Sequence, residues 1–177
     1  ALVPAAMFMH AALAADFKFQ HHFITRDLPV SERGSGDYGL TALVDLDRDG
    51  DLDFVLGGRG SKPAQLYWFE FQRPNQWAQH KVGTDYLSDV GLAPLDVDRD
   101  GWTDLICSGV WYRSTGKPRD SAFDRFVFDE NAVGAHDILI ADVDGDGKSD
   151  GVMMGDERTK LNALCWYSIP SNPKQPW

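Results

Sequence analysis

The sequence lacks the features of several protein classes. Lysine and arginine nowhere cluster, so nothing in the chain indicates nucleic-acid binding. No apolar run is long enough to span a membrane. The Gly-x-Ser-x-Gly pattern of a nucleophile elbow is missing, and no other pairing of a nucleophile with a base is visible. Helical periodicity is missing too, so the chain is predicted to be all-β. Whether the protein is an enzyme stays open, and the missing nucleophile–base pair favours a non-catalytic role.

Cysteine is scarce, because only Cys107 and Cys165 occur among 177 residues. We interpret both as small buried hydrophobic residues. A disulfide between them is the alternative in an exported protein, and the sequence gives it no support.

Charge and composition indicate one acidic domain. Hydrophobic residues make up 43% of the chain, which is enough for a sizeable core, and the formal net charge is −10. Three acidic loops hold twelve carboxylates at shared positions, which exceeds that net charge. The acidity therefore indicates cation sites and not an acidic tail.

The acidic loops share a nine-residue pattern, with aspartate at positions one, three, five and nine and glycine at position six. The copies are residues 45–53, 96–104 and 142–150. Alternate carboxylates on a tightly curled loop supply the oxygen ligands that a hard cation such as Ca²⁺ needs. The expected side-chain ligands are Asp45, Asp47, Asp49 and Asp53, then Asp96, Asp98, Asp100 and Asp104, then Asp142, Asp144, Asp146 and Asp150. At position seven, Asp51, Trp102 and Lys148 are expected to offer only their carbonyl oxygens.

Solvated turns are the alternative interpretation of one such loop. Three complete copies favour a cation, because crowded acidic groups repel each other without a counter-charge. The pattern also resembles the start of an EF-hand, but the glutamate of position twelve is absent. Leu56, Cys107 and Met153 stand there, within apolar runs typical of strands. We therefore expect about three Ca²⁺ ions, bound in loops that connect strands.

The N-terminal segment 1–15 is apolar and ends in Ala12-Leu13-Ala14, a small-x-small cleavage pattern. This is typical of a secretory signal peptide, and cleavage after Ala14 or Ala15 is expected. A buried strand or helix of the fold is the alternative. The domain is then predicted over residues 16–177, and the protein is expected to be secreted, periplasmic or on the cell surface.

Strands of four kinds follow one another in a fixed order. One strand enters each acidic loop, a second leaves it, a third carries an aromatic pair, and a fourth has an aromatic-x-x-His/Phe-x-apolar pattern. In this order the strands are 40–44, 92–95 and 137–141; 54–56, 105–107 and 151–154; 68–69, 111–112 and 166–167; and 19–24, 77–82 and 123–128. Their alternation and their aromatic and β-branched residues favour strands.

The acidic loops begin 51 and 46 residues apart. A period of about 50 residues with four short strands predicts the blades of a β-propeller. Stacked blades bury one another's faces, which suits the aromatic third and fourth strands. The sequence thus predicts an all-β propeller with about three four-stranded blades.

In the Asp-x-Asp-x-Asp-Gly-x-x-Asp loops, the Gly57-Gly58 turn and the Trp-Tyr strand, the chain resembles FG-GAP/VCBS repeats. Integrin α-subunit propellers and many exported bacterial proteins carry such repeats. The resemblance covers about residues 19–177, and it implies Ca²⁺ bound between the first and second strands of each blade. Closed propellers need about 4–8 blades. We therefore expect a fragment of a larger propeller, or a crescent with unpaired edges, in which Phe19–Ile24 could complete the last blade.

A ligand site outside the loops is expected where the first strands begin, near the propeller axis. His136 and Asp137 stand just before one first strand, and Asp37 and Asp89 stand just before the other two. Such residues could rim a central channel, where His136 is suited to proton transfer near neutral pH. Asp137 is expected to point away from His136, because adjacent strand residues face opposite sides. A structural histidine in a turn is the alternative.

Three functions stay open. The first is an exported, non-catalytic, calcium-binding repeat domain that binds carbohydrate or an extracellular protein. The second is the propeller part of a carbohydrate-active enzyme, which a looser resemblance to propeller domains of polysaccharide lyases and sugar dehydratases implies. The third is a structural scaffold without a ligand site.

Overall fold

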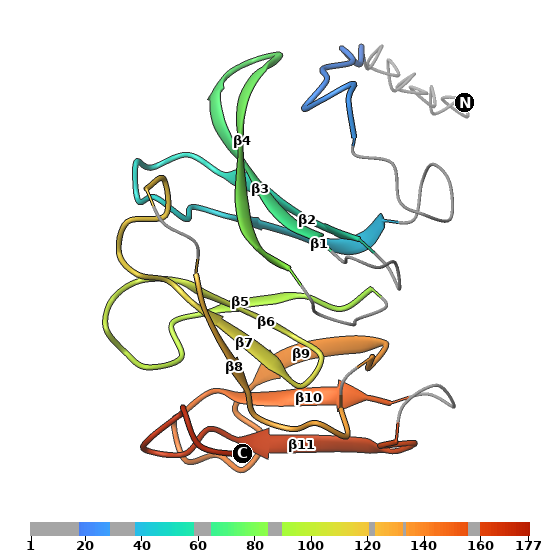
Figure 1. Ribbon diagram of the computed structural model, residues 1–177, viewed down its shortest axis with the longest axis vertical. Coiled ribbons are helices and arrows are strands. Elements are labelled where there is room, and N and C mark those ends of the chain that lie inside the picture. Colours follow the sequence, from blue (N-terminus) through green and yellow to red (C-terminus); the bar gives the residue numbers. More distant parts are fainter. Residues whose placement is uncertain are drawn as a thin grey trace, which may run out of the picture.

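The computed structural model describes residues 18–28, 38–58, 65–84, 90–120, 123–132, 134–155 and 160–177. Every regular element in these residues is a β-strand, and the strands form three antiparallel sheets (Figure 1). The all-β prediction is confirmed. The predicted signal peptide over residues 1–15 lies outside the described residues, as do Asp37 and Asp89. Within the described part of the chain, no helix has the length and apolar character needed to span a membrane.

Each sheet is a meander in which strands that are consecutive in the sequence pair with each other. Blade one consists of β1 (Tyr38–Val44), β2 (Asp53–Gly58), β3 (Gln65–Arg73) and β4 (Gln76–Thr84). Blade two consists of β5 (Ala93–Leu95), β6 (Asp104–Cys107), β7 (Val110–Arg113) and β8 (Asp124–Val127). Blade three consists of β9 (Asp137–Ala141), β10 (Asp150–Met154) and β11 (Leu164–Ser168). This is the strand order of propeller blades, and each acidic loop connects the first strand of a blade to the second, as predicted.

The expected strand at Phe19–Ile24 does not form, so that prediction was wrong. Residues 18–28 lie instead beside the turn between β3 and β4, at the tip of blade one (Figure 1). The Phe23 amide donates to Asn75 Oδ1 at 3.0 Å, and the Asn75 side chain also contacts His22. Phe19 is 96% exposed, so it is not packed on a sheet. This segment therefore contacts blade one and does not complete blade three.

The blades stack face to face in chain order, and two hydrophobic clusters fill the spaces between them (Figure 1). The first cluster contains Trp68 of blade one and Tyr112 of blade two. The second contains Trp111 of blade two and Met153 of blade three. Burial of each large side chain stabilises the stack by roughly 1.5–3 kcal/mol, so much of the core lies between blades and not inside one.

Blade three leaves the corresponding face open. The strand register aligns Leu139, Val152 and Trp166 in one row across β9, β10 and β11. Trp166 occupies the position of Trp68 and Trp111, which are 0% exposed, yet it is 45% exposed itself. Leu139 is 69% exposed. The face that the next blade covers in blades one and two is therefore an exposed apolar surface in blade three.

The two cysteines do not form a disulfide. Both Cys107 and Cys165 are free, and Cys107 is fully buried in the cluster between blades one and two. Burial raises the pKa of the Cys107 thiol to about 12, so it stays protonated. Cys107 thus behaves as the small hydrophobic residue that the sequence predicted.

The turn between β6 and β7 contains only Ser108 and Gly109. Its backbone lies close to the backbone of Asp129, which follows β8. Ser108 has a φ of 55°, and its hydroxyl accepts the Gly134 amide at 2.8 Å. The Gly109 carbonyl accepts the Phe128 amide at 2.9 Å, which fastens the end of β8 to this turn. A Cβ at Gly109 would lie 1.8 Å from the Asp129 carbonyl oxygen. Only glycine fits there.

Gly109→Ala is therefore expected to lower the free energy of unfolding by about 1–3 kcal/mol, because backbone atoms must move apart to admit the methyl group. Urea denaturation followed by circular dichroism measures the loss. Gly151→Ala in β10 is the matched control, since its new Cβ would meet only the Ile138 side chain at 3.8 Å. Equal stability of the Gly109 variant and wild type would contradict this account of the turn.

Candidate metal centres

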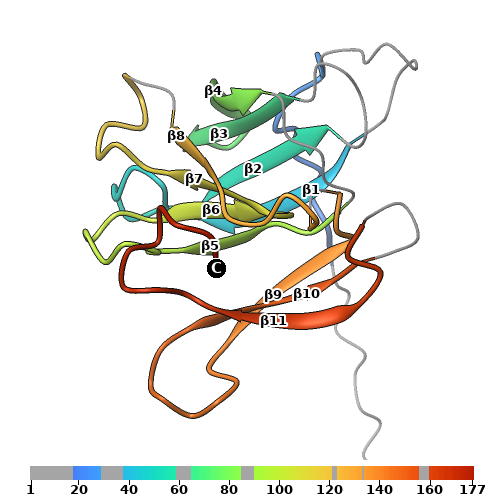
Figure 2. The same ribbon diagram turned by 60° about the horizontal axis from the view of Figure 1, so that its bottom comes forward.

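The three acidic loops extend from the same side of the stacked sheets (Figure 2). Glycine at position six takes a left-handed conformation in all of them, with φ of 99° at Gly50, 91° at Gly101 and 82° at Gly147. A side chain is strained at such angles, so glycine permits the sharp curl. Position four is left-handed as well, which curls each loop a second time; it is occupied by Arg48, Arg99 and Gly145.

The aspartate at position one holds this curl. The carboxylate of Asp45 accepts the amides of Asp49 and Gly50 at 3.2 and 3.1 Å. Asp96 accepts the amides at the same two positions of its loop, and Asp142 accepts those of Gly145 and Gly147. The first carboxylate therefore holds the loop in its curled shape through hydrogen bonds within the chain.

The aspartate at position nine fastens the loop to the sheet. Asp53 accepts the Leu46 amide at 3.1 Å and, across the blade, the Phe71 amide at 3.0 Å. Asp104 accepts the equivalent amides, including that of Ser114 at 2.7 Å. Asp150 accepts the Val143 amide at 3.0 Å. Burial raises the pKa of Asp53 to about 7 and that of Asp104 to about 6, because the loss of hydration outweighs the amide hydrogen bonds that favour each charged form.

The predicted ligands converge only in part. Loops one and two each bring the carboxylates of positions one, three and nine within 4.8 Å of one another, whereas loop three brings together positions one, three and five. These groups are Asp45, Asp47 and Asp53; Asp96, Asp98 and Asp104; and Asp142, Asp144 and Asp146. In loop one, Asp49 instead joins Asp47 and Glu70.

At position seven the side chains diverge, as the variety of residues there suggested. Trp102 lies 5.2 Å from the Arg48 guanidinium, which reaches over from the loop of blade one. The Lys148 ammonium pairs with Asp146. The backbone amides are used alike, since those of Asp51, Trp102 and Lys148 each donate to the carboxylate at position five.

A cationic side chain lies on the carboxylates of every loop. In loop two, Arg113 of β7 contacts Asp98 and Asp100, both at 2.5 Å. In loop one, Arg119 pairs with Asp47, with Asp49 at 3.3 Å and with Glu70 at 2.9 Å. Arg119 belongs to the connection between β7 and β8, so it crosses from blade two to blade one.

Glu70 and Arg113 are site residues that the sequence interpretation missed. Both stand two residues after the tryptophan of the third strand, a position that Ser168 holds in blade three. The third strand lies beside the ninth loop residue, as the pairing of Ser168 with Asp150 illustrates. This position therefore adds a negative charge to loop one, a positive charge to loop two and none to loop three. The Arg119 contact lowers the pKa of Glu70, which keeps that carboxylate ionised.

The internal cations do not satisfy all the carboxylate oxygens. Asp98 Oδ1 and Asp51 Oδ1 are buried and have no hydrogen-bond partner among the described residues. Asp47 Oδ2 is also buried and accepts no hydrogen bond among the described residues, although it forms an ion pair with Arg119. A buried carboxylate oxygen without a partner is costly, and a hard cation is the partner that suits it. The residues present therefore fit Ca²⁺ in the loops.

The proposed channel rim contains a histidine–carboxylate pair. His136 Nδ1 lies 2.8 Å from Asp137 Oδ2, so the expectation that Asp137 points away from His136 was wrong. The alternation of a strand does not apply, because β9 begins only at Asp137. The His136 backbone pairs with Met154 and Gly91 at 2.8 Å, which fixes its position.

Residues 45–107, from the first acidic loop to the end of β6, match the family described as FG-GAP-like repeat. No curated protein and no solved structure has significant similarity to the chain. The match covers the first acidic loop with β2, β3 and β4 of blade one, and then β5, the second acidic loop and β6 of blade two. Residues 45–107 are accordingly an FG-GAP-like repeat, and such repeats form propeller blades.

Proposed function

We propose that the chain is an exported, calcium-binding repeat domain of a β-propeller, which is non-catalytic and binds carbohydrate or an extracellular protein. The observation that carries the calcium proposal is Asp98 Oδ1, a buried oxygen without a hydrogen bond inside a group of three carboxylates. A cation beside it would offset the repulsion between Asp96, Asp98 and Asp104. The FG-GAP-like repeat supports the same assignment, because such repeats often bind Ca²⁺.

The role of the ion in this proposal is structural. Asp96 holds the curl of its loop, while Asp104 fastens the loop to β7 through the Ser114 amide. An ion that binds both carboxylates would connect the first, second and third strands of a blade at one point. About three ions are proposed, one in each acidic loop.

A larger propeller is part of the proposal. Trp68 and Trp111 are each covered by the blade that follows, whereas Trp166 is 45% exposed. Exposed apolar faces of this kind mark interaction surfaces. We infer that a further blade packs on the row Leu139, Val152 and Trp166 in the complete protein.

Calcium is expected to raise the melting temperature of the chain, because an ion that binds only the folded state stabilises it by mass action. At a free concentration about 100-fold above the dissociation constant, each site contributes about 2.7 kcal/mol. Differential scanning calorimetry with excess Ca²⁺, compared with EDTA, measures the shift. Sodium chloride at matched ionic strength controls for screening of the net charge, and identical melting with Ca²⁺ and EDTA would overturn the calcium proposal.

Asp98→Asn is expected to remove one bound ion from each chain while loops one and three keep theirs. The substitution takes away the charge of the buried oxygen that lacks a partner. Equilibrium dialysis counts the ions bound per chain. Asp120→Asn is the matched control, because this exposed carboxylate lies outside the acidic loops. An unchanged count for Asp98→Asn would exclude loop two as a site.

A carbohydrate-active enzyme is the second candidate, and the hydrogen-bonded pair of His136 and Asp137 favours it. In such an enzyme His136 would transfer a proton, and His136→Ala would lower turnover by about 10²–10⁴-fold. Release of unsaturated product from polygalacturonate is a suitable assay for lyase activity. His21→Ala, outside the blades, is the control. Equal turnover by wild type and His136→Ala would assign His136 to a structural role.

A further inference from the structure

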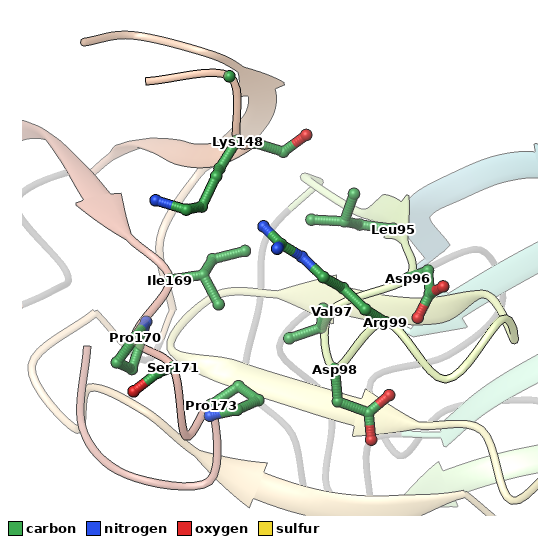
Figure 3. A pocket seen from close by; sticks show the side chains of 12 residues that line it. Leu95, Asp96, Val97, Asp98, Arg99, Lys148, Ile169, Pro170, Ser171 and Pro173 are labelled. Carbon is green, nitrogen blue, oxygen red and sulfur yellow. The ribbon is translucent and has the colours of Figure 1, made fainter. Parts of the chain in front are cut away.

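A groove of about 610 Å³ lies between the loops of blades two and three (Figure 3). Residues 95–99 form one wall and residues 147–149 the other. The segment 169–173, which follows β11, closes the third side with Ile169, Pro170 and Pro173. The groove is thus assembled from three separate parts of the chain.

Two cationic side chains, Arg99 and Lys148, extend into this groove from opposite walls (Figure 3). Arg99 is exposed, and its charge is near enough to Asp146 on the opposite loop for the two to attract each other. Lys148 pairs with Asp146 on its own loop, and 54% of its side chain stays exposed. Two positive charges therefore face the same solvent-filled space.

At the corresponding contact between blades one and two, the arginine faces an aromatic ring and not a lysine. Arg48 has the loop position of Arg99, and its guanidinium lies 5.2 Å from the ring of Trp102. Trp102 in turn has the loop position of Lys148. An arginine over an aromatic ring is attractive, whereas an arginine facing a lysine is repulsive. In the second interface Arg99 faces Lys148 with no aromatic ring at that position, and the Asp146 carboxylate near Arg99 is shared with Lys148.

The acidic residues near the groove are already engaged. Asp98 pairs with Arg113 at 2.5 Å, and Asp96 accepts the amides of Asp100 and Gly101. Both carboxylates point away from Lys148 (Figure 3). Their charge is turned toward the interior of loop two, which leaves the Arg99 side of the groove positive.

We propose that this groove binds an anionic group, a carboxylate or sulfate, with Arg99 and Lys148 as its two charged contacts. Arginine presents a planar fork of donors that fits such a group, and lysine adds a second point of charge. Ser149 and Ser171 add hydroxyl groups to the lining, while Pro170 and Pro173 add apolar surface. That combination suits an acidic sugar, and this part of the proposal rests on the carbohydrate-binding function proposed above.

Isothermal titration of the whole chain with glucuronate, in excess Ca²⁺, tests the site. Wild type is expected to bind glucuronate, and Arg99→Gln and Lys148→Gln are each expected to weaken binding by about tenfold. Glucose and inorganic sulfate are the comparison ligands. Glucose has the ring without the charge and is expected not to bind. Stronger binding of glucuronate than of sulfate supports an acidic sugar, whereas stronger binding of sulfate overturns the sugar assignment and keeps the anion site.

Arg48→Gln is the matched control, because it removes the same side chain at the same loop position of blade one. It is expected to leave glucuronate binding unchanged. Thermal melting of each variant verifies that it is folded, which is expected because the Arg99 side chain is exposed. Absence of glucuronate and sulfate binding by wild type, or equal affinity of wild type and Arg99→Gln, would overturn the anion site. Because these comparisons hold Ca²⁺ constant, they are independent of the melting experiment that tests calcium.

Discussion

Repulsion between carboxylates on one turn of backbone is the constraint on which the rest of this structure depends. Each loop crowds four or five aspartates together, and the chain meets this constraint in two ways. Backbone amides satisfy the carboxylates at positions one and nine, while Arg113, Arg119 and Lys148 supply positive charge. The remaining buried oxygens, such as Asp98 Oδ1, have neither, so they fit a hard cation. Hydrogen bonds and ion pairs within the chain therefore fold the loops, and the proposed ion would supply the charge that these oxygens lack.

Stacking of the blades is the second constraint on the structure. It explains why the tryptophan of the third strand is buried in blades one and two and exposed in blade three. Trp68 and Trp111 lie inside the clusters between blades, whereas Trp166 lies on the open face of blade three. All three side chains are tryptophan, so the difference in exposure arises from the neighbour that each blade has. A repeat of this kind cannot bury its own hydrophobic face and obtains its stability from the next repeat.

Features that depend on neighbouring residues could be predicted from the sequence, whereas contacts between residues far apart in the chain could not. Loop positions and strand order could be predicted, because aspartate spacing and alternation act within about ten residues. Arg119 could not be assigned to loop one, since its partners Asp49 and Glu70 precede it by 70 and 49 residues. Residues 19–24 have the alternation of a strand, but pairing needs a free sheet edge, and they contact Asn75 instead. The aspartate spacing is visible in the sequence, but only the tertiary structure determines that Asp49 turns to Glu70 while Asp53 joins the group at positions one and three.

The reach of Arg119 has a consequence for how the blades unfold. Its guanidinium belongs to blade two, yet its three carboxylate partners belong to blade one. Separating the blades would leave the carboxylates of the first loop without their positive partner. The contact therefore stabilises blade one only when blade two is folded beside it, which favours unfolding of the two repeats together. An ion bound in loop one would then be sensed by blade two, through the same carboxylates that the ion and Arg119 share. Blades one and two are on this basis one cooperative unit.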